Sequence, residues 1–134
     1  MNKEYVTLEV AKLLKEKGFN EPCEYCIHIK TGAICDCDYD HVRVSNSALG
    51  KDWLSCPSLL EVQEWLREEY DCYIQISYEA YTTRVNYLVQ VLFYEPNDDD
   101  CWSNKSTGKY GDNAEFDSFE DTLSFGILEA LKRI

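Results

Sequence analysis

The chain has few of the residues that mark disordered or fibrous proteins. Its 134 residues include only three prolines and six glycines, whereas 45% are hydrophobic and 13% are aromatic. This composition is typical of a folded globular protein, so we expect no long disordered region. A chain of this length buries roughly two-thirds of its unfolded surface. We therefore expect a single domain, residues 1–134, that needs neither a metal nor a disulfide to fold.

Positive charge is also scarce. Lys and Arg number 13 against 25 Asp and Glu, and the formal net charge is −12. Nucleic-acid binders usually have the opposite charge because they must neutralise phosphates, and anionic lipid headgroups repel an acidic surface too. We therefore expect no direct nucleic-acid binding and no membrane binding. The acidity either keeps the protein in solution or engages basic sites on another protein.

Long apolar runs and a secretory leader are missing as well. No segment reaches the ~20 apolar residues that span a bilayer. The opening segment MNKEYVTLEVAKLL contains acidic residues within its apolar part and has no cleavage site of small residues. The seven cysteines are an odd number, so disulfides within one chain cannot pair them all. We expect a cytoplasmic protein whose cysteines are thiols.

The first segment with helical periodicity covers residues 8–17. Thr7 stands at the N-cap position, and the apolar residues that follow share one helical face. Gly18 suits the left-handed position after a helix, and Phe19 is expected to fold back on Leu14. These signals predict a helix with defined ends.

Two more helices are expected. The second covers residues 58–70, where Ser58 and Glu61 have the spacing of a capping box. The third begins at Asp117 or Ser118 and reaches the end of the chain. Its inner face is predicted to consist of Phe119, Leu123, Ile127, Ala130, Leu131 and Ile134.

Alternating apolar residues indicate strands between these helices. Strands are expected at residues 24–30, 33–37, 72–81 and 86–95. Residues 38–56 are expected to form a loop with at most a short strand, and residues 95–115 a long loop. The last of these strands is apolar on both faces, which is typical of a central strand. The order α-β-β-α-β-β-α predicts an α+β domain whose helices pack on one face of an antiparallel sheet.

The segment PCEYCIHIKTGAICDCD, residues 22–38, contains four cysteines and one of the two histidines. A two-residue turn at Thr31-Gly32 would pair position 28 with 35 and position 26 with 37. One face of this hairpin then carries Cys26, His28, Cys35 and Cys37. Cysteine and histidine are the ligands that zinc prefers, so a small zinc-stabilised module is one hypothesis.

The expected hairpin geometry favours a different interpretation. Side chains on one pleated face point in nearly parallel directions, whereas a zinc site needs ligands that converge. Tight turns would still allow a site made of Cys23, Cys26, Cys35 and Cys37. We prefer the interpretation in which these cysteines are strand residues and the protein holds no cofactor.

Signals for catalysis are weak. The chain has no G-x-S-x-G motif, and STGK lacks the upstream glycine of a phosphate-binding loop. A reactive cysteine needs electropositive surroundings, whereas Asp36, Asp38 and Asp40 surround Cys35 and Cys37 with negative charge. We therefore expect that the protein is not an enzyme.

Tyrosine is unusually frequent, with ten copies. Tyrosine is enriched in interfaces because it combines a large contact area with a polar tip. The candidate partner-binding residues are Tyr73, Tyr78, Tyr81, Tyr87 and Trp102. The alternative is that the tyrosines fill the margins of the core and that Trp102 anchors its loop.

Three segments carry a resemblance to a known group of proteins: KEYVTLEVAKLLKEKGFNEPC, CPSLLEVQEWLREEYDCYIQI and FDSFEDTLSFGILEALKRI. They resemble small uncharacterised proteins of phages and mobile elements of gut anaerobic bacteria. The resemblance implies a phage or mobile-element protein in a bacterial cytoplasm, and it implies no activity and no catalytic residues. We expect an accessory protein that binds an unidentified protein, for example a host factor.

Overall fold

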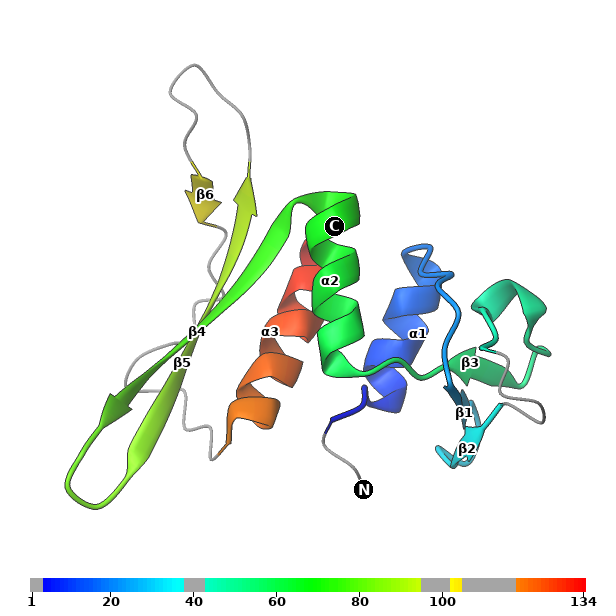
Figure 1. The fold of residues 1–134 in the computed structure, drawn as a ribbon, viewed down its shortest axis with the longest axis horizontal. Helices are drawn as coiled ribbons and strands as arrows, with labels where there is room; N and C mark the ends of the chain where they lie inside the picture. The colour runs from blue at the N-terminus through cyan, green and yellow to red at the C-terminus, as the bar shows by residue number, and fades with distance from the viewer. Residues whose placement is uncertain (1–3, 38–42, 95–101, 105–117) are drawn as a thin grey trace. The chain divides into compact units, whose positions relative to one another are not determined.

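The computed structural model describes residues 4–37, 43–94, 102–104 and 118–134. The helices are α1 (Leu8–Glu16), α2 (Leu59–Tyr70), α3 (Phe119–Arg133) and the short 3-10 helix η1 (Asn46–Ala48). The strands are β1 (Tyr25–His28), β2 (Ile34–Asp36), β3 (Trp53–Ser55), β4 (Cys72–Ala80), β5 (Val85–Tyr94) and β6 (Trp102–Asn104). The α+β class and the predicted order of elements are confirmed, with β3 and β6 as additional short strands (Figure 1).

The strands form two antiparallel sheets rather than the one expected, with orders β2-β1-β3 and β4-β5-β6. The chain divides by its contacts into two compact units, unit 1 (Met1–Glu61) and unit 2 (Val62–Ile134). The boundary falls inside α2. The single domain over residues 1–134 stays a prediction.

Helix α1 has the ends that the sequence predicts. The Thr7 hydroxyl accepts a hydrogen bond from the backbone amide three residues further on, at 3.3 Å. After the helix, Gly18 has φ 91° and donates to Lys15 O at 3.1 Å, and Phe19 donates to Leu14 O at 2.8 Å. This is the hydrogen-bond pair of a Schellman motif, and both Leu14 and Phe19 are buried.

The β1–β2 register differs from the prediction. Cys26 lies opposite Cys35 rather than opposite Cys37, so the expected pairing was wrong by two positions. The reason is a wider turn of four residues, 29–32, in which Gly32 has φ 71° and donates to His28 O at 2.8 Å. The shift is an even number of positions, so the hairpin cysteines keep the predicted faces.

A histidine stabilises this wider turn. His28 Nδ1 accepts hydrogen bonds from the amides of Lys30 and Thr31, at 3.2 and 3.3 Å. Its ring also meets the Trp53 ring edge to face, with centroids 4.9 Å apart. The imidazole thus accepts hydrogen bonds from two amides of the four-residue turn.

A buried asparagine connects three segments of unit 1. Asn46 Nδ2 donates to Phe19 O at 2.9 Å, and Asn46 Oδ1 accepts from the Ser55 amide at 2.8 Å. Both hydrogen bonds are buried. Because burying an unpaired polar group is costly, one amide side chain holds the end of α1 and strand β3 together.

Helix α2 begins with the predicted capping box. Glu61 N donates to Ser58 Oγ at 3.1 Å, and Ser58 N donates to Glu61 Oε2 at 3.1 Å. The two residues satisfy each other's backbone amides at the start of the helix, where no intrahelical partner exists.

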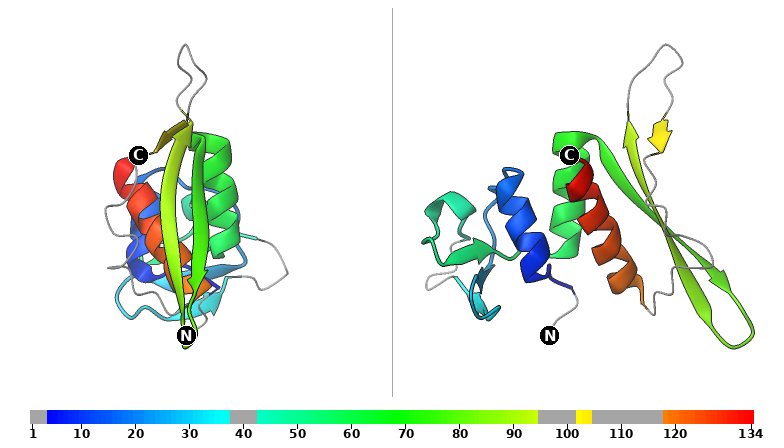
Figure 2. Two further views of the ribbon diagram at one scale, coloured as in Figure 1. Left: turned by 90° about the vertical axis from the view of Figure 1, so that its left-hand side faces the viewer. Right: turned by 180° about the vertical axis from the view of Figure 1, so that it is seen from behind.

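In unit 2, β4 and β5 form a long hairpin, and β5 is the central strand as predicted. The ladder runs without interruption from the pair Cys72–Phe93 to the pair Ala80–Val85. Helix α3 covers one face of this hairpin (Figure 2). At Gly126 the approach is close, because an added Cβ would lie 2.7 Å from Ile74 Cγ2 and 2.8 Å from Val89 Cγ2.

Helix α3 is capped by Ser118, whose hydroxyl accepts from the Asp121 amide at 3.1 Å. Leu123 and Ile127 are buried as predicted, and Phe119 lies against the hairpin but is 46% exposed. Its ring belongs to the first turn of α3, beside a part of the hairpin that the helix leaves uncovered.

Within the described residues, no helix is long and apolar enough to cross a membrane.

Candidate functional site

The predicted partner-binding tyrosines do not share one surface. Ile74 and Val89 face Gly126, and side chains alternate along a strand, so Tyr78 and Tyr87 also lie on the α3 side of the hairpin. They stand directly opposite each other on β4 and β5. Tyr73 is 39% exposed and lies on the other face. The structure therefore brings together two of the predicted residues and separates the third from them.

The remaining two predicted residues lie outside this pair. The Tyr81 hydroxyl donates to Glu79 Oε2 at 2.8 Å, and the Arg84 guanidinium lies 5.4 Å from the centre of its ring. Tyr81 is thus engaged near the hairpin turn. Trp102 begins β6, where its backbone pairs with Tyr94, but its side chain lies outside the described part of the chain.

Tyr78 and Tyr87 line an open apolar groove, which we call the arm groove. Its lining residues are Ile76, Tyr78, Val85, Tyr87 and Phe119, and its volume is about 410 Å³. Tyr78 is 70% exposed and Val85 is 44% exposed. No lining side chain carries a charge, so the groove is a cluster of large apolar groups exposed to water.

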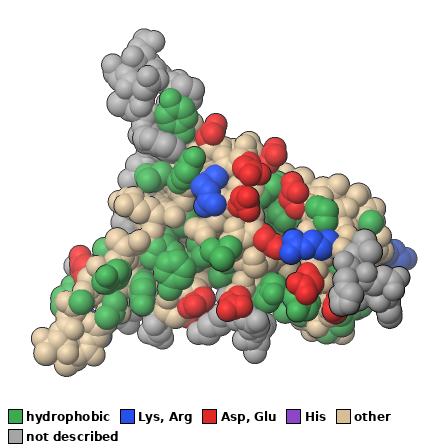
Figure 3. Space-filling view, viewed as in Figure 1, with side chains coloured by type: hydrophobic (Ala, Val, Ile, Leu, Met, Phe, Trp, Pro, Cys, Tyr) green, Lys and Arg blue, Asp and Glu red, His purple; other side chains and the backbone are tan. Residues whose placement is uncertain are grey.

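The groove exists because the hairpin is longer than the part that α3 covers. Gly126 packs on Ile74 and Val89, whereas the first turn of α3 reaches only the edge of the pair Tyr78–Tyr87. The hairpin from Cys72 to Tyr94 contains one acidic and one basic residue, so it has no net charge in a chain of −12. Figure 3 shows hydrophobic side chains gathered along this hairpin with few charged ones.

Ile76, Val85 and Phe119 also line this site and were not among the predicted binding residues. One available signal was the charge distribution, because no other long segment combines so many apolar residues with so few charges. The other was strand parity, which places Ile76 and Tyr78 on one face and Tyr73 on the other. The sequence did not indicate how much of the hairpin α3 covers.

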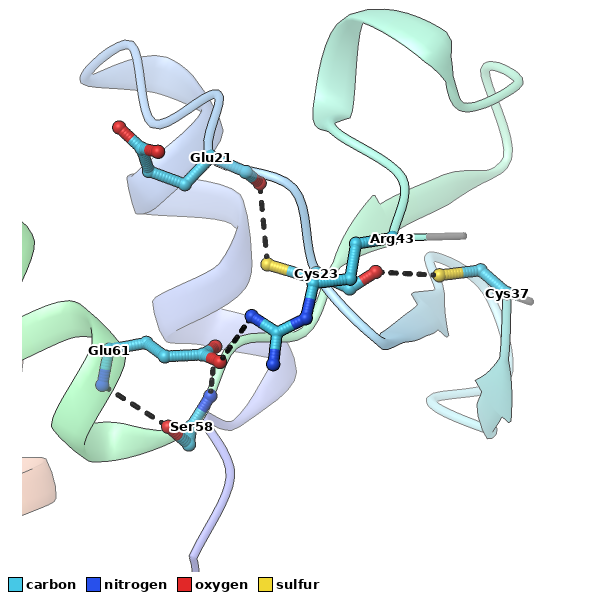
Figure 4. Close-up of polar contacts among 6 residues, drawn as sticks. All are labelled: Glu21, Cys23, Cys37, Arg43, Ser58 and Glu61. Carbon is cyan, nitrogen blue, oxygen red and sulfur yellow. Dashed lines mark hydrogen bonds and ion pairs between the residues drawn. The ribbon is translucent and has the colours of Figure 1, made fainter. Parts of the chain in front are cut away.

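The predicted metal ligands lie in unit 1, in and beside the β1–β2 hairpin. Figure 4 shows two of them, Cys23 and Cys37. Their thiols donate hydrogen bonds to backbone carbonyls: Cys23 to Glu21 O at 3.4 Å, Cys26 to Cys35 O at 3.6 Å, and Cys37 to Cys23 O at 3.3 Å. Cys35 itself is exposed, whereas Cys23 and Cys26 are buried. The thiols thus behave as small weakly polar groups that partner carbonyl oxygens.

No three of these side chains converge on one point. Across the described ranges, no group of three or more His, Cys, Asp or Glu side chains has the arrangement that holds a metal ion. His41, the second histidine of the chain, lies outside those ranges. The zinc site of Cys23, Cys26, Cys35 and Cys37 stays a prediction that no observed arrangement supports.

Burial also makes these thiols poor ligands and nucleophiles at neutral pH. It raises the pKa of Cys23 and Cys26 to about 12 and the pKa of Cys56 to about 11. Since the thiolate is the form that binds metal or attacks a substrate, each of these thiols would first have to lose a strongly held proton.

Comparison of the chain with protein-family models, with curated proteins and with solved structures finds no match. The function is therefore inferred from the residues of this chain, and the arm groove is the candidate site.

Proposed function

We propose that this protein is an accessory protein of a phage or mobile element that binds another protein, a bacterial host factor, through the arm groove. It acts by binding and not by catalysis, in the cytoplasm of the bacterial host. The observation that carries the proposal is a cluster of exposed aromatic and aliphatic side chains without charge, in a chain whose net charge is −12. Such patches on folded proteins mark interaction sites.

The chemistry of the groove supports a protein partner. Tyr78, Tyr87 and Phe119 each provide a large apolar area, and tyrosine also has a hydroxyl that can bond to a partner's backbone. Aromatic side chains of this kind dominate the binding energy of protein interfaces. The groove is open, and no polar groups converge in it as they do in sites for small polar ligands.

The charge of the chain indicates the partner's chemistry. An apolar side chain would fill the groove, while basic residues around it would face the acidic surface of this protein. The resemblance of the three helical segments to phage and mobile-element proteins supports the assignment of origin and cellular location. It supplies no partner, so the partner is described by its surface alone.

Affinity capture from bacterial host lysate tests the proposal with matched variants. Phe119→Ser and Tyr87→Ser remove groove side chains, and we expect each to reduce capture of the partner at least about tenfold, the cost of about 1.4 kcal/mol. Leu60→Ser and Tyr73→Ser are the controls, because Leu60 is 69% exposed outside the groove and Tyr73 lies on the opposite face of β4. Both should retain the partner.

Two results would overturn this function. One is the absence of a stoichiometric partner at low and moderate salt. The other is a partner whose capture falls equally in the groove variants and the controls. Capture that weakens steadily as salt rises would support a basic rim on the partner.

A further inference from the structure

Strand β4 forms an open edge of the sheet in unit 2. At one end of the hairpin the Tyr81 amide donates to Arg84 O at 2.7 Å, and at the other the Tyr94 amide donates to Asp71 O at 2.9 Å. Antiparallel pairs alternate between bonded and non-bonded, so the odd-numbered residues of β4 bond to β5. The even-numbered residues point their N–H and C=O groups away from β5: Cys72, Ile74, Ile76, Tyr78 and Ala80.

This edge has few of the features that prevent strands from pairing between molecules, since Glu79 is its one charged residue. Natural edge strands are commonly short or contain lysine, proline or a bulge. Strand β4 is nine residues long, its ladder has no bulge, and its sequence CYIQISYEA contains neither lysine nor proline. No strand in the described part of the chain pairs with its outer side.

We propose that β4 pairs antiparallel with β4 of a second copy of this chain, joining two three-stranded sheets into one of six strands. The inference goes beyond the proposed function and does not depend on it. The register that overlaps all nine residues places Ile76 opposite Ile76 of the second copy. It also places Ile74 opposite Tyr78, so even-numbered residues meet even-numbered residues and the outward backbone groups pair.

The side chains fit this register. Residues on the α3 side of one copy continue onto the α3 side of the other, because pairs of equal parity share a face. Tyr78, which is 70% exposed, gains Ile74 of the second copy as an apolar neighbour. The one charged residue of the strand, Glu79, stands opposite Tyr73 and not opposite a second Glu79.

The distribution of charge favours contact between two copies of the chain at the β4–β5 hairpin. Two chains of net charge −12 repel each other, and the repulsion is weakest where their neutral segments meet. The hairpin from Cys72 to Tyr94 is such a segment, since Glu79 and Arg84 are its only charged residues. The structure shows no comparable feature that would favour a strand of a different protein. We therefore assign a second copy of this chain as the partner of β4.

Sedimentation or light scattering of the full chain at about 100 μM tests for the dimer, a concentration well above a micromolar Kd. We expect twice the chain mass of 15.6 kDa. Amide hydrogen exchange of the unmodified protein gives a second measurement. In the dimer all amides of β4 are protected, whereas in a monomer only the odd-numbered ones are.

A pair of proline variants identifies the edge. Tyr78→Pro removes an outward amide from β4, and Tyr87→Pro removes the matching outward amide from β5, directly across the hairpin. Each variant loses one groove tyrosine and no hydrogen bond between β4 and β5. We expect Tyr78→Pro to have the mass of one chain and Tyr87→Pro to have the mass of two.

A wild-type mass of one chain, or fast exchange of the even-numbered amides of β4, would overturn the dimer. Equal masses for the two proline variants, with both still folded, would assign the contact to another surface and overturn it too. Partner capture is read separately, because Phe119→Ser changes the groove outside β4 and should leave the dimer intact. Failure of the dimer and failure of the proposed function are thus distinguishable.

Discussion

The two units are stabilised by different kinds of contact. Unit 1 has strands of three or four residues, and side chains such as Asn46 and His28 complete the backbone hydrogen bonding. Unit 2 has strands of nine and ten residues, and α3 packs on them through apolar contacts around Gly126. Both units bury apolar residues. They differ in that polar side chains complete the hydrogen bonding around the short strands of unit 1, whereas the long hairpin of unit 2 leaves apolar side chains exposed.

The strongest test of this difference is Asn46→Ala in unit 1. It removes two buried hydrogen bonds, those of Asn46 with Phe19 O and with the Ser55 amide, so we expect the free energy of unfolding to fall by about 2–3 kcal/mol. Asn20→Ala is the matched control, because Asn20 Oδ1 accepts from the exposed Ser47 amide. In the variant, water can accept that hydrogen bond. Urea denaturation should show a loss of less than about 1 kcal/mol for the control. Equal losses would contradict the role of Asn46.

The corresponding test in unit 2 is Gly126→Ala. The new methyl group would meet methyl groups of Ile74 and Val89 that sit close to the backbone and cannot swing away. We expect a loss of about 1–2 kcal/mol, since overpacking outweighs the gain in helix propensity. Gly50→Ala is the control, with no atom within 4 Å of the added group, and should change stability by no more than about 0.5 kcal/mol. A Gly126→Ala variant as stable as wild type would show that the Ile74 and Val89 side chains move aside at little cost in free energy.

The smallest expected effect is a fall in stability at alkaline pH, to which the thiols of unit 1 contribute more than that of unit 2. Burial raises the pKa of Cys23, Cys26 and Cys56 above the ordinary value of 9.0, and these thiols lie in unit 1, whereas Cys72 lies in unit 2. Above pH 9 the unfolded chain releases protons that the folded chain keeps, so stability falls as pH rises toward 11 or 12. From pH 8 to 9.5 we expect a loss of a few tenths of a kcal/mol per thiol, after a discount for solvent screening.

Melting curves at the two pH values check this dependence. Cys23→Val should make the slope shallower, because it removes one of the titrating thiols. A slope that does not change in this variant would mean that Cys23 does not contribute to the dependence.

Local signals predicted the parts of the fold that depend on neighbours in sequence. The Schellman motif at Gly18 and the capping box of Ser58 and Glu61 were predicted because each involves residues only a few positions apart. The β1–β2 register was not predicted, because the His28 ring favours a four-residue turn over a two-residue turn. The division of the tyrosines between two faces follows from strand parity, but the division of the strands into two sheets does not.

By itself, the amino-acid sequence determined the helices, their caps, the central position of β5 and the neutral character of the hairpin, because these depend on composition and on short-range spacing. Only the tertiary structure decided how much of the hairpin α3 covers and which carbonyls the thiols contact. These outcomes depend on contacts between residues far apart in the chain. An apolar residue becomes a surface for binding only where the fold leaves it uncovered.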